Sequence, residues 1–285
     1  MQKIKQLVLS SRPVSWVNTA YPFGATYLVL TGQVDLTFVL GCLFFLIPYN
    51  LLMYGINDVF DYESDLRNPR KKGAEGIVLQ PALHRLTIIS AIASCLPFII
   101  TLMLLTGTGA RWTLLAIIFG VVAYSAPGLR FKEKPFLDSV TSSLHFVGPM
   151  IFAIVASGQS IRTTLPFVAA FFLWGLASHA FGAVQDIKAD RAGGIGSLAT
   201  VIGARQTVWF SLACYGLSII LVASQASWQT SVIALSLTPY ILNVLPYYTV
   251  SEADAPRTNS AWRRFIYLNF FTGMVITMVL IADTL

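Results

Sequence analysis

Acidic side chains gather at two places in a chain that has few of them. In the stretch NDVFDYESD at 57–65, Asp58, Asp61 and Asp65 stand at positions i, i+3 and i+7. If this stretch is helical, the three carboxylates share one face and their oxygens can converge. Glu63 points away from that face, and we expect solvent around it. Converging carboxylates of this kind favour the binding of a metal ion.

A second acidic pair follows an apolar stretch later in the chain. Asp186 and Asp190, in QDIKAD, stand at i and i+4 and also share a helical face. If the two motifs face each other, five carboxylates and Asn57 line one cavity, and that much negative charge needs a cation. Mg²⁺ takes oxygen ligands and commonly combines a few carboxylates with substrate phosphates. We therefore predict Mg²⁺ as cofactor, with these metal ligands: Asp58, Asp61, Asp65, Asp186 and Asp190.

Basic residues flank both motifs and suggest that the metal ions act on a diphosphate. Metal ions would bridge carboxylates to phosphate, and bases would pair with the remaining oxygens. A run of charge beside an apolar segment is usually a solvated loop end, but two acidic clusters flanked by bases favour a site. The candidate diphosphate-binding residues near the motifs are Asn57, Arg67, Arg70, Lys132, Lys188 and Arg191. Arg130 lies near Lys132 in YSAPGLRFK.

The elements that position these residues are predicted to be membrane-spanning helices. Of the 285 residues 55% are hydrophobic and 11% charged, against about 25% charged in soluble domains. Long apolar runs without period-two alternation favour helices over a barrel. Nine spans are predicted, at 14–30, 36–56, 84–106, 112–125, 138–157, 164–184, 206–224, 229–250 and 264–283. We expect an all-α membrane protein with one domain over 1–285, a single bundle around a central cavity that opens to the cytoplasmic side.

The distribution of charge predicts the orientation in the membrane. Apart from Arg111 and Arg162, the 19 basic residues lie before the first span or around the even-numbered loops. Because basic residues concentrate on the cytoplasmic side, the N-terminus and the predicted active site face the cytoplasm, and the lipid bilayer of the cell membrane is a partner. The net charge of +6 could suggest a nucleic-acid-binding protein, but the same distribution of basic residues argues against it.

These motifs resemble those of a known family. NDVFDYESD is similar to the NDxxDxxxD signature of the UbiA-type intramembrane prenyltransferases, and QDIKADRAGGIGSLAT to their second motif. The resemblance covers essentially the whole chain. It implies that the two motifs bind Mg²⁺ and a prenyl diphosphate, whose prenyl group passes to a lipophilic acceptor. The aspartates of both motifs are then catalytic residues.

Tyr124 is a further catalytic candidate. Many family members have a lysine four residues after a tyrosine, but here that position is Gly128, and the bases follow at Arg130 and Lys132. Which base contacts phosphate is left open. Aromatic faces can stabilise an allylic cation, and most aromatic residues simply pack. The candidates near the motifs are Tyr49, Tyr54, Tyr124, Phe146 and Trp174.

A narrower resemblance concerns the acceptor. SSRPVSWVNTAYPFGATYL and YSAPGLRFKEKPFLDSVTSSLHFVGP resemble segments of the lycopene elongases of fifty-carbon carotenoid pathways. That resemblance implies transfer of dimethylallyl groups from dimethylallyl diphosphate to lycopene, in some cases with hydration. Acceptors of the quinone, chlorophyll or haem type remain alternatives. Asp138, His145 and His179 are given no catalytic role.

Two other readings of the same residues stay open. Acidic residues near spans also mark ion pathways, so a divalent-cation transporter is the alternative from another class. A membrane scaffold with an acidic docking loop is a third reading, but it leaves the second motif unexplained. Arg12 has two readings as well. A lone arginine before a span commonly extends to the headgroups. In contrast, SRP resembles the family's first-helix entry, where the base faces the cavity, and this resemblance implies that Arg12 is a further diphosphate-binding residue.

Overall fold

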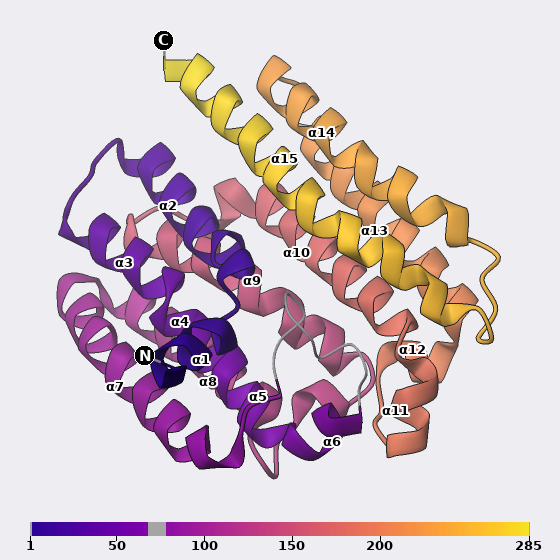
Figure 1. Ribbon diagram of the computed structural model, residues 1–285. Helices are drawn as coiled ribbons and strands as arrows, with labels where there is room; N and C mark the ends of the chain where they lie inside the picture. The colour runs from indigo at the N-terminus through magenta and orange to yellow at the C-terminus, as the bar shows by residue number, and fades with distance from the viewer. Residues whose placement is uncertain (1, 68–77, 285) are drawn as a thin grey trace. The chain divides into compact units, whose positions relative to one another are not determined.

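The computed structural model describes residues 2–67 and 78–284, and within these ranges the chain forms helices and no β-strand (Figure 1). The α-helices are α1 (Gln2–Ser10), α2 (Val17–Thr31), α3 (Leu36–Leu46), α4 (Pro48–Asn50), α5 (Ile56–Phe60), α6 (Tyr62–Arg67), α7 (Pro81–Leu105), α8 (Thr108–Ser125), α9 (Leu137–Ala156), α10 (Ile161–Val184), α11 (Ile187–Gly193), α12 (Leu198–Ile202), α13 (Ala204–Ala223), α14 (Trp228–Val244) and α15 (Asn259–Thr284). Shorter helical turns are η1 (Pro13–Ser15), η2 (Leu51–Gly55), η3 (Phe131–Glu133), η4 (Leu245–Tyr247) and η5 (Ala255–Thr258).

Eight helical segments within the described residues have the length and hydropathy to cross a membrane. They are Leu36–Phe60, Pro81–Leu105, Thr108–Ser125, Leu137–Ala156, Ile161–Val184, Ala204–Ala223, Trp228–Tyr247 and Ala255–Asp283. These segments coincide with the second to ninth predicted spans, so the expected all-helical membrane fold is confirmed. The predicted first span falls on α2, whose 15 residues are fewer than the about 20 that cross a bilayer. A ninth span is therefore not confirmed.

The chain divides into two compact units. The first comprises Met1–Phe131 and Gly148–Ile161, and the second comprises Lys132–Val147 and Arg162–Leu285. The division passes through α9, which contributes residues to both units. The first acidic motif belongs to the first unit and the second motif to the second unit. The prediction of one domain over 1–285 stays a prediction.

Aromatic side chains fill the core of the first unit. Phe23 from α2 packs between Phe45 from α3 and Phe152 from α9, with ring centroids 5.3 Å and 5.9 Å away. Tyr49, an aromatic candidate for the site, is fully buried in this core beside Phe45. Gly41 allows α2 and α3 to pack this closely, because a β-carbon there would overlap the Phe23 ring. The core thus fixes the helices that lead to the first motif.

The helix that leads to the first motif is interrupted before it arrives. Pro48 has no N–H to continue the helical hydrogen bonds of α3, and the chain passes through α4 and one π-helical turn, η2, before α5. The buried Asn50 side chain donates from Nδ2 to the carbonyl oxygens of Phe45 (2.9 Å) and Leu46 (2.8 Å). Satisfied carbonyls make such a break tolerable within a membrane span. Asn57 and Asp58 follow this break, in the last turn of the Leu36–Phe60 span.

In the second unit α13, α14 and α15 lie side by side, at the orange-to-yellow end of the chain in Figure 1. Their core is again aromatic. Trp174 from α10 stacks on Phe265 from α15 with centroids 5.5 Å apart, and Tyr215 from α13 stacks on Tyr240 from α14 at the same spacing. Trp174, proposed from sequence as a cavity residue, is therefore part of this packed core. The core supports α10, whose end carries the second motif.

Candidate active site

Asp58, the first aspartate of the first motif, is fully buried and paired with two partners from the N-terminal segment. Arg12 Nη2 lies 3.3 Å from Asp58 Oδ1, and the Ser10 hydroxyl donates to Asp58 Oδ2 at 3.0 Å. The guanidinium of Arg12 also lies 4.3 Å from the centre of the Tyr54 ring, a cation–π contact. Arg12 therefore faces protein rather than headgroups. Tyr54, another aromatic candidate, contacts this arginine.

Burial and the charged groups around it act in opposite directions on the pKa of Arg12. Burial, the largest single contribution, lowers the pKa of Arg12, but attraction to Asp58, the hydrogen bond to Asp58, and the nearby Tyr54 and Asp65 together raise it more, so the pKa of Arg12 lies above its ordinary value. Arg12 also has a left-handed backbone (φ 50°), which costs free energy for a residue with a side chain. The contact with Asp58 is kept in spite of that cost.

Asp61 and Asn57 are held by the end of α8 and the turn after it. Arg130 Nη2 lies 3.4 Å from Asp61 Oδ1, and the Ser125 hydroxyl donates to Asn57 Oδ1 at 2.9 Å. Tyr124, the catalytic candidate, directly precedes Ser125 and is half-buried. The end of α8 thus supplies a hydroxyl group to the motif, and the turn after α8 supplies a guanidinium group.

Asp65 lies in α6 and is also buried, with 6% of the residue exposed. Glu63, on the same short helix, is exposed, as expected from the sequence. Of the bases predicted to follow this motif, Arg67 ends α6 and only its backbone is described, while Arg70 lies outside the described residues. Their predicted contacts with phosphate stay predictions.

The helix of the first motif is interrupted at Asp61, although backbone hydrogen bonds of helical spacing continue, with the Asp61 N–H donating to the Asn57 carbonyl at 2.9 Å and the Asp65 N–H to the Asp61 carbonyl at 2.8 Å. α5 ends at Phe60, and Asp61 leaves the helical conformation (φ −101°, ψ 4°) before α6 begins at Tyr62. Within the described ranges, no three histidine, cysteine or acidic side chains converge as a closed metal site. Asp58 and Asp61 nevertheless offer oxygens that each contact a cationic guanidinium. This donor set fits a hard cation that takes its other ligands from water and phosphate.

The second motif begins where α10 ends. Asp186 lies between α10 and α11, and Asp190 lies one turn later, in α11. The Asp190 N–H donates to the Asp186 carbonyl at 2.8 Å. The two side chains therefore share a face, as the i, i+4 spacing predicted. Gly194 ends α11 with a left-handed backbone (φ 69°), and the chain turns back into α12. Both aspartates are partly exposed.

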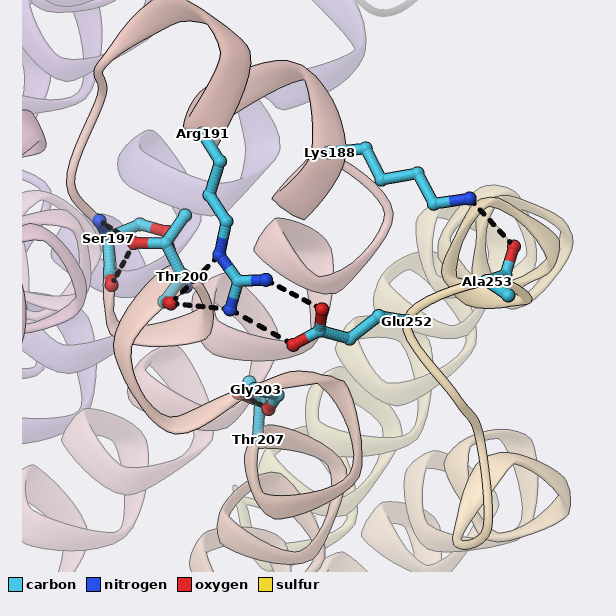
Figure 2. A network of polar contacts seen from close by, with 8 residues as sticks. All are labelled: Lys188, Arg191, Ser197, Thr200, Gly203, Thr207, Glu252 and Ala253. Atoms are coloured by element: carbon cyan, nitrogen blue, oxygen red, sulfur yellow. Dashed lines mark hydrogen bonds and ion pairs between the residues drawn. The ribbon is translucent and has the colours of Figure 1, made fainter.

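The bases interleaved with the second motif contact the connection between α14 and α15 (Figure 2). Arg191 donates to both carboxylate oxygens of Glu252, at 2.6 Å and 3.0 Å, and also to the Thr200 carbonyl. Lys188 Nζ donates to the Ala253 carbonyl at 3.3 Å. The hydrogen bond to Arg191 lowers the pKa of Glu252 below its ordinary value. These contacts fasten α11 to its own unit, and the predicted diphosphate contacts of both bases stay predictions.

Asp138 is a buried acidic residue to which the sequence assigned no role. Its Oδ2 accepts the N–H of Leu198 at 3.1 Å and lies 3.5 Å from His179 Nε2. Asp138 lies at the start of α9, Leu198 lies in α12, and His179 lies in α10. Asp138 thus joins three elements of the second unit and supports the helix that carries Asp186. Lys132 lies nearby in sequence, half-buried in η3.

Ser10, Ser125 and Arg130 are the polar contacts of the first motif that sequence reasoning missed or left unassigned. Ser10 is 48 residues from Asp58, and Arg130 is 69 residues from Asp61. Local spacing carries no signal for such pairs. The only hint was the position of Arg130 and Ser125 within YSAPGLRFK. The meeting of the two acidic motifs, one from each unit, stays a prediction.

Curated relatives match almost the whole chain. It is 50% identical over 98% of its length to the C(50) beta-cyclic carotenoids biosynthesis protein LbtBC of Dietzia sp. (strain CQ4), of which it spans 65%. It is 46% identical to a lycopene elongase/hydratase of Corynebacterium glutamicum, with 99% of this chain and 98% of that protein aligned.

Solved structures share the fold at low sequence identity. A UbiA homolog from Archaeoglobus fulgidus bound to DMAPP and Mg²⁺ superposes with a TM-score of 0.66, at 20% identity, over 95% of this chain and 99% of that one. The apo structure of a UbiA homolog from Aeropyrum pernix K1 gives a TM-score of 0.70, at 18% identity, over 95% of this chain and 99% of that one. At these identities the likeness concerns the fold.

The family itself is identified by sequence. The UbiA prenyltransferase family matches residues 20–273, which include both acidic motifs. With the helical fold, the apolar spans and the relatives above, this excludes the transporter and scaffold readings. The chain belongs to the UbiA prenyltransferase family and is an integral, multi-pass membrane prenyltransferase.

Proposed function

We propose that this prenyltransferase transfers a dimethylallyl group from dimethylallyl diphosphate to lycopene, in a Mg²⁺-dependent reaction of carotenoid biosynthesis. The acceptor is inferred from the relative that aligns over nearly its full length, the lycopene elongase/hydratase of Corynebacterium glutamicum. The donor is inferred from the DMAPP and Mg²⁺ bound to the Archaeoglobus fulgidus homolog. Transfer to a quinone, chlorophyll-type or haem-type acceptor is the alternative within the family.

One observation supports binding of a diphosphate: two aspartates of the first motif are each paired with the guanidinium group of an arginine. Asp58 lies against Arg12, and Asp61 lies against Arg130. A diphosphate needs both kinds of group, since metal ions on carboxylates neutralise some phosphate oxygens and guanidinium groups donate to others. An ion pathway needs only the carboxylates.

The metal ligands would come from both motifs. Asp58, Asp61 and Asp65 of the first motif and Asp186 and Asp190 of the second would hold Mg²⁺ together with the diphosphate oxygens. When bound, Mg²⁺ would neutralise the negative charge that develops on the leaving diphosphate. The candidate diphosphate donors are Asn57, Arg12, Lys132, Lys188 and Arg191, with Arg67 and Arg70 from the segment after the first motif.

The reaction has three bond changes. The bond between the allylic carbon and the diphosphate oxygen breaks, and both electrons leave with the diphosphate. The π electrons of a terminal double bond of the acceptor form the new carbon–carbon bond. The resulting cation then loses a proton, or takes up water and releases a proton from it. Tyr124, next to the Ser125–Asn57 hydrogen bond, is the aromatic residue that we propose to face the allylic cation.

The chain's apolar spans serve this chemistry in two ways. They exclude water from the allylic cation until the carbon–carbon bond has formed, and they admit a lipophilic acceptor directly from the bilayer. The asymmetry of basic residues further supports an active site on the cytoplasmic side of the cell membrane, with the N-terminus on that same side.

Expression of the chain in bacteria that accumulate lycopene, followed by mass analysis of the pigments, tests the proposal. The proposed activity adds one or two five-carbon units to lycopene, with or without water. The Asp61→Asn variant is the matched control, because it removes one charge from the motif and keeps the shape of the side chain.

Two outcomes would contradict the proposal in different ways. Unchanged lycopene, with protein present in the membrane, would reject the acceptor and direct the search to quinone, chlorophyll-type and haem-type acceptors. Elongated pigment from Asp61→Asn at the wild-type rate would instead reject the role of the first motif.

A further inference from the structure

The first helix, α1, presents an apolar face that the protein leaves uncovered. Ile4 and Val8, one helical turn apart, are 68% and 39% exposed, and Leu9 beside them is 39% exposed. On the opposite side of the helix, Gln6 is half-buried and Ser10 is fully buried. The polar side of α1 therefore packs against protein and its apolar side faces outward, the reverse of a helix in a soluble protein.

The contacts of α1 place it at the end of a membrane span. Ser10, the last residue of α1, donates to Asp58 at 3.0 Å, and its hydroxyl would lie 3.6 Å from a β-carbon on Gly55. Gly55 and Asp58 belong to the last turns of the Leu36–Phe60 span. The end of an apolar span lies where the hydrocarbon meets the lipid headgroups. The end of α1 therefore lies at the depth of the headgroups.

Two lysines flank the apolar face. Lys3 and Lys5 stand one residue to either side of Ile4, so each is turned by about 100° from it around the helix axis. Both are exposed, and among the described residues neither has a hydrogen-bond or ion-pair partner. An outward apolar face with flanking lysines is typical of helices that lie in the membrane interface, where ammonium groups reach the lipid phosphates.

The end of α1 is connected directly to the buried carboxylate of the first motif. The Arg12 N–H donates to the Leu9 carbonyl at 3.0 Å, which continues the turn of α1 as far as Arg12. Ser10 and Arg12, which both contact Asp58, are therefore carried by α1. An interaction that holds α1 on the membrane surface also holds these two side chains against Asp58.

We propose that α1 is a membrane-interface helix whose lysines bind anionic lipid headgroups, and that this binding holds Ser10 and Arg12 against Asp58. The partner is a lipid with a negative headgroup, such as phosphatidylglycerol, since each lysine adds to the attraction and the apolar face fits the region just below the phosphates. The lipid-binding surface follows from α1 alone. Its effect on diphosphate binding rests on the proposed function, in which Arg12 is a diphosphate donor.

Hydrogen exchange of the full chain in lipid nanodiscs tests the surface without any substrate. Wild-type protein is compared in phosphatidylcholine with and without phosphatidylglycerol. The amides of α1 should exchange about tenfold more slowly when the anionic lipid is present, because the attraction of two lysines has to be overcome before the helix opens.

Two matched variants assign this effect to the lysines. Lys3→Gln with Lys5→Gln removes both charges and keeps the apolar face, so its α1 exchange should differ by less than about twofold between the two lipids. Lys3→Arg with Lys5→Arg keeps both charges and should behave like wild type. A general effect of lipid charge on the exchange reaction would act on all three proteins alike.

Pyrophosphate titrated in excess Mg²⁺ into the same nanodiscs measures the effect on the candidate active site. Phosphatidylglycerol should raise the pyrophosphate affinity of wild type about fivefold more than that of the double glutamine variant, because only wild type gains the lysine–lipid contact. The variant supplies the correction for attraction of Mg²⁺ to the lipid itself, which is the same for both proteins.

The outcomes separate the surface, its link to Asp58 and the proposed function. Equal α1 exchange of wild type in the two lipids, or equal slowing in the glutamine variant, would overturn the lipid-binding surface. Exchange that slows with the number of copies per nanodisc, and not with phosphatidylglycerol, would overturn it too and assign the face to a second copy. Lipid-dependent exchange with lipid-independent pyrophosphate affinity would overturn the link to Asp58. Lipid-dependent exchange without pyrophosphate binding in either lipid would support the surface and overturn the proposed function.

Discussion

A buried aspartate has to be compensated, and Asp58 shows how this chain does it. The residue is fully buried, and a lone carboxylate in such a place would be neutralised or destabilising. Arg12 supplies the charge and Ser10 a hydroxyl donor, both from the segment before α2. The N-terminal segment is therefore part of the candidate active site.

Removal of Arg12 should expose the cost of that burial. The Arg12→Gln variant leaves Asp58 buried without its counter-charge, so the free energy of unfolding should fall by about 3 kcal/mol. Thermal and denaturant unfolding of the purified protein in detergent would measure the change.

The matched control is the double variant Arg12→Gln with Asp58→Asn. It removes both charges, and most of the lost stability should return. A double variant that is less stable than Arg12→Gln would mean that the two residues do not compensate each other.

At the scale of elements, the break between α3 and α5 directs the first motif. Pro48 ends α3, and the π-helical turn η2 shifts the register of the residues that follow. Asn50 keeps the break stable by its hydrogen bonds to the Phe45 and Leu46 carbonyls. The direction of Asp58 thus depends on an amide group two helical turns before it.

Replacement of that amide should destabilise the fold. Asn50→Ala removes the amide donor from the Phe45 and Leu46 carbonyls, of which Phe45 keeps the Thr19 hydroxyl at 2.7 Å, and should lower the free energy of unfolding by about 1 kcal/mol. Thr230→Ala is the control. It removes a hydroxyl that caps α14 in the second unit and leaves the hydrogen bonds at the Pro48 break in place. Equal stability of Asn50→Ala and wild type would show that the break does not need the Asn50 amide.

The second motif depends on a different element contact, between α11 and the connection that carries Glu252. The pKa of Glu252 is lowered by Arg191, so this contact stabilises the fold above the unfolded-state pKa of about 4.3 and is lost as the pH falls through the folded-state value. Glu252→Gln should therefore speed hydrogen exchange of α11 at pH 7.

The sign of the pH dependence gives the control. At a pH below the lowered folded-state pKa, Glu252 is protonated in both the folded and the unfolded state, and wild type and Glu252→Gln should exchange α11 amides at similar rates when compared at that same pH. A difference that persists undiminished at low pH would show that the carboxylate charge does not hold α11.

At the scale of the whole molecule, hydropathy predicted most of the helices because long apolar runs have few alternatives in a bilayer. Eight of the predicted spans have matching helices, and the i, i+4 spacing of Asp186 and Asp190 correctly predicted a shared face. The sequence did not predict which kind of break occurs at Pro48, because a proline in a span can kink, end or merely bend a helix.

The contacts of the first motif could not be predicted from spacing. Ser10 and Arg130 lie 48 and 69 residues from their aspartates, so only the packing of α5 with its neighbours brings them there. Arg191 illustrates the same limit. Its position beside Asp190 indicated a phosphate ligand, but Glu252, 61 residues away, also reaches its guanidinium. Local sequence indicates which groups are available and leaves their partners to tertiary packing.

The central proposal is that both acidic motifs are needed to bind Mg²⁺ and the diphosphate. Binding of dimethylallyl diphosphate in excess Mg²⁺, measured for wild type, Asp61→Asn, Asp186→Asn and the double variant, tests this most directly. We predict that each single variant loses at least about tenfold in affinity, that the double variant is little worse than either, and that EDTA abolishes wild-type binding. Wild-type affinity of Asp186→Asn, or strictly additive losses, would contradict a shared site.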